Sequence, residues 1–480
     1  MSAPVMVTPM EALSRAAQRI SAEFVGTDAV FNRVISDTRQ LQRGDLFVAL
    51  VGEHHDGHDF LRRAASLGAA GALVSRRIDT ELPQILVPDT LRGLQDYARA
   101  WRSTFSAPLI GVTGSNGKTT TKQLLAAVLA ARGPVLATEG NLNNHIGVPL
   151  TLARLRAEHR SAVIEMGANH PHEIAQLASL ARPDIGIVTQ AGDAHLEGFG
   201  TREGVARSKG ELFTALGARG TAVINADDAY AALWRDLAGL ARKLTFGFAA
   251  GADVRAENVQ SFTLAGGRSG SRFMLITPSG RAEVELPLPG RHNIANALAA
   301  AACGVALDMD AADIAAGLGK VQGAAGRVDW KTTLQGARLI DDSYNANPTS
   351  LRAGLELLAA QKGRRWAVLG GMAELGPTAP ELHEAAGRAA RDLGIDRLYA
   401  QGALAAHYAR GYGSGAKIFD DTAALIAAIE HDLKHELKQD LKKEPAADVT
   451  LLVKGSRSAR MDAVVQALVG TDPANNREPY

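Results

Sequence analysis

The sequence predicts an α/β protein of three domains, built around a central parallel sheet that is covered by helices. A chain of 480 residues is too long for a single hydrophobic core. Short apolar runs alternate with Ala- and Leu-rich helical stretches along most of it. We expect a small α/β domain over 1–88, a central nucleotide-binding domain over 89–323 and a Rossmann-like α/β domain over 324–480.

The N-terminal 88 residues contain short alternating elements without a nucleotide loop. Helices are expected at 11–20 and 60–69, and strands at 45–50, 71–75 and 84–88.

Two polar stretches, at 36–45 and 52–60, lie on either side of the apolar run at 46–51. The second stretch has three histidines within five residues, so a metal site is one interpretation. No carboxylate or cysteine completes a recognisable ligand spacing, and turns are the simpler interpretation.

Composition excludes several classes of function. The formal net charge is +1, from 52 Lys and Arg against 51 Asp and Glu, which gives no long-range attraction to nucleic acid or to an anionic membrane. The single cysteine, Cys303, lies in an Ala-rich helical run and is expected in the core. The chain has no signal segment, no apolar window of about 18 residues and no heptads. We therefore expect a cytoplasmic protein, monomeric and without membrane insertion.

A phosphate cradle is expected at 109–130, where an apolar strand enters a Gly-rich turn and then a helix. Gly114 and Gly117 let successive N–H groups and the helix N-terminus converge on one anion. Lys118 adds a positive charge, and the hydroxyl of Thr119 is placed to hold Mg²⁺. The standard pattern has a glycine five positions before Gly117, where this chain has valine. An ordinary strand-to-helix turn is the alternative.

Polar residues follow the expected central strands, at the edge where parallel sheets bind ligands. Glu165 lies between Ile164 and Met166 in a strand that should be buried, so its charge needs a cation. The strands are expected at 161–167, 183–190, 221–228 and 243–248, and the other polar residues after them are Gln190, Asn225, Asp227 and Asp228.

Two amide-rich segments are less specific. The segment 138–152 lies between two expected apolar helices and could be a simple asparagine turn. Asn293 and Asn296 lie three residues apart on one face of the helix that begins in 288–307, and helix capping is the alternative for them.

The third domain is expected to begin near residue 324, where a second series of strands, each followed by a loop, starts. Strands are expected from 339, 364, 396, 417 and 449, without a second phosphate loop. A helix at 431–444 has leucines every four residues and is expected to be a solvated surface helix without function.

These motifs together resemble the Mur ligases, the ATP-dependent amino-acid ligases of peptidoglycan synthesis. The resemblance begins with TGSNGKTT in the cradle and covers all three domains. The other segments that carry it are SDTR, DGHDF, NLNNHIGVP, HNIAN, IDDSYNANPTS, GGMAELG and KGSRSARM.

The resemblance implies roles that the residues alone leave open. His195 by itself would be a surface imidazole, and Lys209 an exposed helical lysine; in the family they ligate magnesium, Lys209 as a carbamate. The catalytic residues implied are Lys118, Glu165, His195 and Lys209, and the Mg²⁺ ligands are Thr119, Glu165, His195 and carbamylated Lys209. ATP would contact Gly114, Ser115, Asn116, Gly117, Lys118, Thr119, Thr120, Asn293, Asn296, Arg327 and Asp342. The substrate that carries uridine diphosphate would contact Ser36, Asp37, Thr38, Arg39, Asn143 and Asn144.

Within the family the motifs are most similar to the ligases that add the terminal dipeptide. This implies transfer of D-alanyl-D-alanine to UDP-N-acetylmuramoyl-tripeptide (UDP-MurNAc-tripeptide) through an acyl phosphate, with ATP and Mg²⁺, in cell-wall synthesis. The C-terminal domain would close over ATP and bind the dipeptide. Whether the third residue of the tripeptide is meso-diaminopimelate or lysine stays open.

Three other functions are weighed. The ligase that adds the third residue should carry a DNPR motif, which is absent. Folylpolyglutamate synthetase shares the loop and the metal chemistry but not SDTR or DGHDF. A P-loop NTPase switch would need no domain for a sugar nucleotide.

Overall fold

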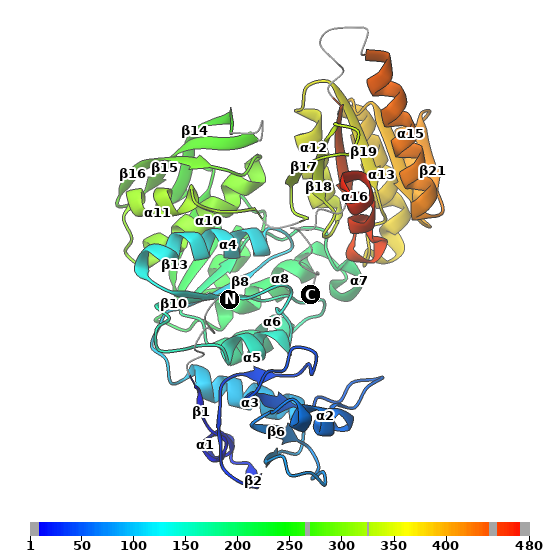
Figure 1. Cartoon of the computed structure of the whole chain (residues 1–480). Coiled ribbons are helices and arrows are strands. Elements are labelled where there is room, and N and C mark those ends of the chain that lie inside the picture. Colours follow the sequence, from blue (N-terminus) through cyan, green and yellow to red (C-terminus); the bar gives the residue numbers. More distant parts are fainter. Residues whose placement is uncertain (1–8, 265–268, 324–325, 441–448, 471–480) are drawn as a thin grey trace.

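The structure, a computed structural model, describes residues 9–264, 269–323, 326–440 and 449–470. Three large β-sheets follow one another along the chain, each with its own helices (Figure 1). The α/β class and the three-domain organisation are therefore confirmed. None of the helices in these ranges combines the length and the apolar character that crossing a bilayer requires.

The N-terminal domain is built on a sheet with the order β2-β7-β6-β5-β4, in which β2 runs antiparallel to β7 and the other pairs are parallel. The expected helices and strands are present. The strands β1 to β4, of two or three residues each, were not predicted. The elements are β1 (Glu11–Ala12), α1 (Leu13–Arg19), β2 (Glu23–Val25), β3 (Val30–Phe31), β4 (Val34–Ile35), β5 (Leu46–Val48), η1 (Gly57–Phe60), α2 (Leu61–Ser66), β6 (Gly71–Val74) and β7 (Gln84–Leu86).

Helix α3 (Thr90–Arg102) joins the N-terminal domain to the central domain. Asp89 caps it by accepting a hydrogen bond from a first-turn N–H. The indole N–H of Trp101 donates to the carbonyl of Leu155 in the central domain at 3.1 Å. Leu94 and Trp101 belong to one apolar core that continues from α1 to the α5–α6 face of the central sheet. The first two domains are thus packed as one unit.

The central sheet has the order β16-β15-β14-β13-β12-β11-β8-β10-β9. The strands from β9 to β14 in this order are parallel, as the sequence predicts, and β8 lies between β10 and β11. The carboxyl ends of these strands therefore meet at one edge, beside the phosphate loop. The parallel strands are β8 (Leu109–Thr113), β9 (Val135–Ala137), β10 (Ser161–Glu165), β11 (Ile185–Val188), β12 (Thr221–Asn225), β13 (Arg242–Gly247) and β14 (Val254–Thr263).

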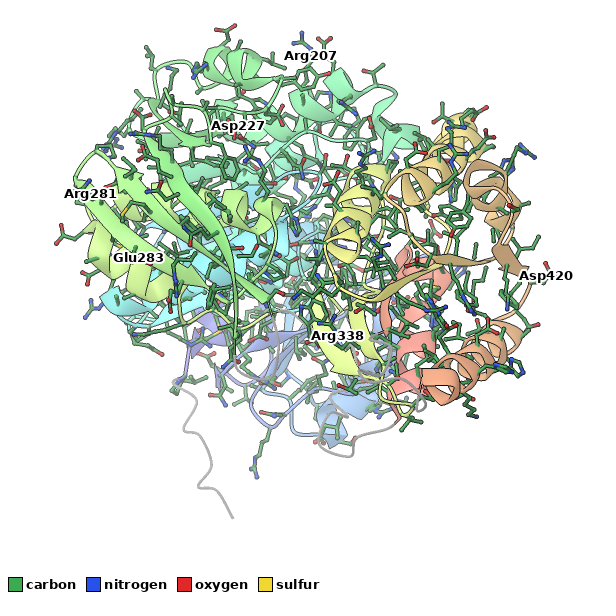
Figure 2. The ribbon with its side chains drawn as sticks, turned by 90° about the horizontal axis from the view of Figure 1, so that it is seen from above. Arg207, Asp227, Arg281, Glu283, Arg338 and Asp420 are labelled. Atoms are coloured by element: carbon green, nitrogen blue, oxygen red, sulfur yellow. The ribbon has the colours of Figure 1, made fainter. Side chains whose placement is uncertain are left out.

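Two features of this sheet differ from the sequence expectation. Strands β15 (Ser269–Thr277) and β16 (Gly280–Leu286) extend it in antiparallel fashion. Exposed Arg281 and Glu283 of β16 alternate with inward residues at its outer edge (Figure 2), so this edge lacks the continuous apolar runs of the parallel strands. The segment 138–152 follows β9, not a helix, because the apolar run before it is only three residues long.

Helices cover both faces of the central sheet. Helices α4, α10 and α11 pack on one face and α5, α6, α8 and α9 on the other. Cys303 of α10 is completely buried, which confirms its expected place in the core. The helices are α4 (Lys118–Leu129), η2 (Ala130–Arg132), α5 (Gly147–Leu152), α6 (Glu173–Ala181), α7 (Leu196–Phe199), α8 (Arg202–Thr214), α9 (Ala231–Leu237), α10 (Arg291–Ala306) and α11 (Ala311–Leu318).

The C-terminal sheet has the order β17-β18-β22-β19-β20-β21, and β17 runs antiparallel to the rest. Helices α12 to α14 cover one face, and α15 and α16 the other. The chain therefore switches faces between β19 and β22. The elements are β17 (Asp329–Thr332), β18 (Arg338–Asp342), α12 (Pro348–Ala359), β19 (Arg364–Leu369), η4 (Gly376–Thr378), α13 (Ala379–Asp392), β20 (Arg397–Gln401), α14 (Ala405–Tyr412), β21 (Ala416–Phe419), α15 (Thr422–Asp440), β22 (Val449–Lys454), η5 (Arg457–Ala459) and α16 (Met461–Val469).

The helix expected at 431–444 forms the end of α15, and its residues 441–444 lie outside the described ranges. The expectation of a solvated helix is wrong for Asp432 and Glu436, which are buried. Leu433 is completely buried, and the buried carboxylates of Asp432 and Glu436 bind arginine and lysine side chains of the neighbouring strands. His431, Lys434 and His435 are exposed as expected, but Asp432 and Glu436 form an ion-pair network against the sheet. A sequence pattern alone cannot distinguish such buried charges from solvated ones.

Candidate active site

A cavity of about 300 Å³ lies between the phosphate loop of the central domain and the C-terminal domain. Every residue predicted to contact ATP lines it, except Gly114. From the central domain these are Ser115 to Thr120, Asn293 and Asn296, and from the C-terminal side Arg327 and Asp342.

The phosphate loop needs its two glycines for space as well as for conformation. Gly114 has φ +142°, and a Cβ there would lie 2.0 Å from the hydroxyl oxygen of Thr189. Gly117 has φ +82°, and a Cβ there would lie 2.2 Å from the side-chain oxygen of Asn296. Any other residue at either position would therefore displace a neighbour. The interpretation as an ordinary turn does not account for this close packing.

Lys118 begins helix α4, and its ammonium donates to the carbonyl oxygen of Gly114 at 2.7 Å. Burial lowers the pKa of Lys118, and the nearby charge of Glu165 opposes the shift. The lysine thus spans the mouth of the loop, where the charge of a phosphate would favour its ammonium form.

Glu165 ends strand β10 and is almost completely buried beside the loop. Its Oε1 accepts hydrogen bonds from Asn143 Nδ2 at 2.9 Å and from Thr119 Oγ1 at 3.3 Å. Its Oε2 lies 3.5 Å from Nζ of Lys122 but has no hydrogen-bond partner among the described residues. Burial alone would raise the pKa of Glu165, but the charges of Lys122 and Lys118 outweigh burial and lower it.

Lys122 is the cation that the sequence analysis required for Glu165 without identifying it. It lies four residues after Lys118, on the same face of α4, and only 7% of its side chain is exposed. In the sequence, the four-residue spacing from Lys118 indicates only that both lysines lie on one side of the helix. Four-residue periodicity alone does not show which side of a helix faces a buried carboxylate.

The two asparagines predicted to contact substrate have different surroundings. Asn143 donates to Glu165 and so lies against the end of β10, although neither residue lines the cavity itself. The side-chain oxygen of Asn144 accepts hydrogen bonds from the N–H groups of Ile146 and Gly147 and so holds the start of α5. For both residues the substrate contact stays a prediction. Asn293 donates to the carbonyl of Pro289 at 2.8 Å within the same cavity wall.

His195 follows β11 and precedes α7, with a left-handed backbone of φ +55°. Its Nδ1 contacts the carboxylate of Glu374 from the C-terminal domain. Burial and the charges of Lys118 and Lys209 lower the pKa of His195, against the opposing charge of Glu374. The neutral imidazole that results is the form that ligates a metal.

Lys209 lies inside helix α8 and is 1% exposed, which excludes the exposed-lysine alternative. Its ammonium donates to the carbonyl of Ala168 at 2.9 Å and lies 4.9 Å from the ring centre of Phe199. Burial, followed by the charge of Lys118, lowers the pKa of Lys209 to about 7. A large fraction of this amine is therefore neutral and nucleophilic near neutral pH.

The C-terminal domain also lines the cavity with Tyr344, Asn347 and Lys454, to which sequence reasoning gave no role. The guanidinium of Arg327 lies over the ring of Tyr344, 4.3 Å from its centre. The buried ammonium of Lys454 donates to Asp342 at 2.6 Å. Asn347, which caps α12, exchanges side-chain hydrogen bonds with Asn116 of the loop. Asn347 and Lys454 come from segments that resembled the family as motifs, but their partners are 231 and 112 residues away in sequence.

The N-terminal residues predicted to bind the sugar nucleotide lie after strand β4, and the phosphate cavity is lined by other residues. Asp37 and Arg39 form an ion pair at 2.6 Å, with the Arg39 side chain 82% exposed, and Thr38 is buried. Ser36 is partly exposed beside them. Their role stays a prediction.

The histidines at 52–60 do not form a metal site in the described part of the chain, where no group of three or more His, Cys, Asp or Glu side chains is placed to hold a metal. His58 is buried, with Nδ1 2.6 Å from Asp56 and Nε2 accepting from the N–H of Ser75. It stabilises the turn, in line with the simpler interpretation.

The predicted magnesium ligands are only partly brought together. Thr119 and Glu165 are in contact, whereas His195 and Lys209 bond to Glu374 and to a carbonyl. The buried Oε2 of Glu165 has an ion-pair partner in Lys122 but accepts no hydrogen bond from the described residues. This oxygen and a hydroxyl beside the phosphate loop fit Mg²⁺, which is usually held by one or two carboxylates together with phosphate oxygens and water. The residues present therefore fit the metal.

Comparison with known proteins identifies the family. Residues 112–304 match the Mur ligase middle domain, and residues 326–468 match the family described as Mur ligase, glutamate ligase domain. The UDP-N-acetylmuramoyl-tripeptide–D-alanyl-D-alanine ligase of Escherichia coli K12 is 42% identical over 95% of this chain and 98% of its own length. The ligase of the same name from Bacillus subtilis is 33% identical over 92% of this chain and 93% of its own.

Solved structures indicate the same family. A crystal structure of MurF from Acinetobacter baumannii superposes with a TM-score of 0.88 at 33% identity, covering 97% of this chain and 100% of that one. MurF from Thermotoga maritima in complex with ADP gives a TM-score of 0.75 at 26% identity, covering 91% and 96%. The chain therefore belongs to the Mur ligase family.

Proposed function

We propose that this chain is an ATP-dependent ligase that joins D-alanyl-D-alanine to UDP-MurNAc-tripeptide and so forms the pentapeptide precursor of peptidoglycan. The observation that carries this conclusion is one cavity in which a phosphate loop meets residues of the C-terminal domain. Relatives with this activity in their names match nearly the whole chain.

The chemistry explains why ATP is consumed. A carboxylate is a poor acyl donor, so the terminal carboxylate of the tripeptide first attacks the γ-phosphate in line and gives an acyl phosphate and ADP. Lys118 and the N–H groups of the loop stabilise charge on the transferred phosphoryl group. The amine of the dipeptide then attacks the acyl carbon, and inorganic phosphate leaves as the amide bond forms.

Thr119, which lines this cavity, and Glu165, which contacts Thr119, would hold Mg²⁺, with His195 and carbamylated Lys209 as further ligands. When bound, the metal would neutralise phosphate charge. Lys122 and Asn143 hold the Glu165 carboxylate at the carboxyl end of β10. The ATP contacts predicted for Asn293, Asn296, Arg327 and Asp342 are supported by their place in the same cavity.

The cleft at the switch point of the C-terminal sheet is the proposed site of the incoming dipeptide. Ligands of open α/β sheets bind where neighbouring strands send their helices to opposite faces, as β19 and β22 do here. An open cleft of about 390 Å³ lies at the ends of these strands. It is lined chiefly by Gly371 to Ala373, Gln401 to Leu404, Ser456 and Ser458 to Arg460.

Each domain then holds one reactant. We assign the sugar-nucleotide end of the tripeptide substrate to 1–88, with Ser36 to Arg39 near the diphosphate, ATP to 89–323 and the dipeptide to 324–480. The shared core of the first two domains supports motion of the C-terminal domain against them as the closing step.

A turnover assay tests the function. Purified protein receives ATP, Mg²⁺, D-alanyl-D-alanine and either the meso-diaminopimelate or the lysine tripeptide, and the product is read by mass. We expect pentapeptide only when both substrates are present, with one phosphate released for each amide bond. Phosphate release without the tripeptide would favour an NTPase switch. In a parallel reaction that contains a dipeptide precursor and free amino acids, addition of a single amino acid would indicate the third-residue ligase.

A further inference from the structure

The contact between His195 and Glu374 joins two domains at the edge of the proposed metal site. The Glu374 carboxylate contacts Nδ1 of His195, and the Glu374 carbonyl oxygen accepts a hydrogen bond of 3.4 Å from the N–H of Glu197. His195 and Glu374 both have a left-handed backbone, with φ +55° and +60°. Such a backbone is uncommon outside glycine and costs free energy, so both side chains are presented by backbones that the surrounding structure must hold in place.

The loop that carries Glu374 is fixed inside the C-terminal domain. His383 is completely buried beneath it, and its Nε2 accepts a hydrogen bond from the N–H of Met372 at 2.9 Å. The other ring nitrogen lies 2.6 Å from the carbonyl oxygen of Ala379, and the ring packs edge-on against Tyr408. Because the loop is anchored in this way, Glu374 reaches His195 only when the C-terminal domain lies against the central one.

The position of the contact on the imidazole ring is informative. A histidine that ligates a metal usually gives its second ring N–H to a carboxylate or carbonyl, which fixes the tautomer and the ring orientation. Here Nδ1 of His195 faces the carboxylate, which leaves Nε2 free of that contact.

We propose that Glu374 is the positioning residue for His195: it holds the proton on Nδ1 and so presents the lone pair of Nε2 for Mg²⁺. This inference rests on the proposed function. The carboxylate belongs to the C-terminal domain, so the orientation of this ligand depends on the contact between domains. Metal binding and domain closure are thereby coupled through one pair of side chains.

Metal binding tests the proposal directly. Mn²⁺ is titrated into the full chain in the presence of a non-hydrolysable ATP analogue, and free Mn²⁺ is read by electron paramagnetic resonance. Glu374→Ala should weaken Mn²⁺ binding at least about 10-fold, and Glu374→Gln should weaken it less because its carbonyl oxygen can still accept from Nδ1. Glu381→Gln removes an exposed carboxylate of the same domain, in α13, and should bind Mn²⁺ like the parent.

The tautomer of His195 distinguishes a positioning role of Glu374 from a general effect of its negative charge on the metal. With ¹⁵N-labelled histidine and no metal added, the parent should show His195 as the Nδ1–H tautomer, assigned by its loss in His195→Ala. Glu374→Ala should change that tautomer population while the melting temperature stays within a few degrees of the parent. In the His195→Ala background, Glu374→Ala should have no further effect on Mn²⁺ affinity.

The failures of the two proposals are distinguishable. If the parent protein forms no pentapeptide, the proposed function fails whatever the titrations show. If the parent forms pentapeptide but Glu374→Ala binds Mn²⁺ as tightly as the parent, or keeps its effect without His195, the positioning role is overturned. A fall in kcat with unchanged metal affinity would instead place Glu374 at the dipeptide.

Discussion

Asn116 of the phosphate loop and Asn347 of the C-terminal domain exchange two side-chain hydrogen bonds. The Asn347 amide donates to the Asn116 oxygen at 2.7 Å, and the Asn116 amide donates back at 3.2 Å. The same oxygen of Asn347 caps α12 by accepting from the N–H of Ser350 at 3.0 Å. One side chain therefore both starts a helix and joins the two domains that enclose the nucleotide cavity.

The two roles of Asn347 are separable by substitution. Asn347→Asp keeps the capping oxygen but loses the amide donor and adds negative charge beside the phosphates, so we expect an unchanged melting temperature and an increase of about 5-fold or more in KM for ATP. Asn347→Ala should also lose about 1 kcal/mol of stability with the cap. Thermal unfolding and steady-state kinetics measure both effects. Asp89→Ala, which uncaps α3 away from the cavity, should lower stability without changing KM; an unchanged KM in Asn347→Asp would contradict the joining role.

Lys118→Ala should reduce turnover by at least about 10²-fold, because the transferring phosphoryl group loses its nearest fixed cation. The measurement is kcat at saturating ATP, with circular dichroism to check folding. Retention of most activity would remove the phosphate-loop assignment.

Lys209 is expected to act as a carbamate. Its pKa of about 7 means that the amine is largely neutral above this pH and can add to CO₂, whereas below it the ammonium form cannot. Activity should therefore fall as the pH drops below about 7. Carbon-13 NMR with ¹³CO₂ should show a carbamate signal that is absent in Lys209→Ala.

The same variant provides a chemical rescue. Lys209→Ala should be folded and nearly inactive, and short-chain carboxylates should restore part of its activity by replacing the missing anion. Lys209→Arg keeps the positive charge but cannot form the carbamate, so it should also be inactive. An active Lys209→Arg enzyme would refute the carbamate and leave the ligase assignment intact.

In the absence of ligands, Lys122→Met should lower the free energy of unfolding. The Lys122 and Glu165 side chains are 7% and 3% exposed, and removing one partner of a buried ion pair costs roughly 3–5 kcal/mol. Mg²⁺ with ADP should recover part of this loss, because a bound cation compensates Glu165. Thermal unfolding with and without these ligands measures the effect. The double variant Lys122→Met, Glu165→Gln should be more stable than Lys122→Met alone; if it is not, the pair does not account for the loss.

The ion-pair network of α15 predicts that the protein loses stability as the pH falls. Burial opposes ionisation of Asp432, but hydrogen bonds from Lys417 and Tyr399 outweigh it and lower the pKa of Asp432 to about 2. The folded pKa lies below the ordinary value of 3.8, so this contribution is present above pH 4 and is lost as the pH falls toward 2. Asp432→Asn should flatten the fall of stability in this window, measured by denaturant unfolding. The exposed Asp420→Asn serves as control and should keep the slope of the parent (Figure 2).

The sequence by itself determined the class of fold, the phosphate loop and the parallel strands beside it. These features follow from local patterns: glycines at fixed spacing before Lys118, continuous apolar runs in strands buried on both faces, and helical periodicity between them. The burial of Cys303 and the need of Glu165 for a cation could be inferred in the same way, since each depends mainly on the residues next to it in the chain. Family motifs then indicated which side chains face the nucleotide.

Only the tertiary structure decided which partners these side chains have. Lys122 pairs with Glu165 across 43 positions of the sequence, Asn347 meets Asn116 across 231, and Glu374 meets His195 across 179. The antiparallel strands β15 and β16 were missed because one exposed face removes the continuous apolar pattern of a buried strand. The ion pairs of Asp432 and Glu436 were missed because charged residues on a helix usually indicate a solvated face. Contacts between distant segments arise from the packing of whole domains, so no local pattern contains them, and they are the contacts that close the cavity.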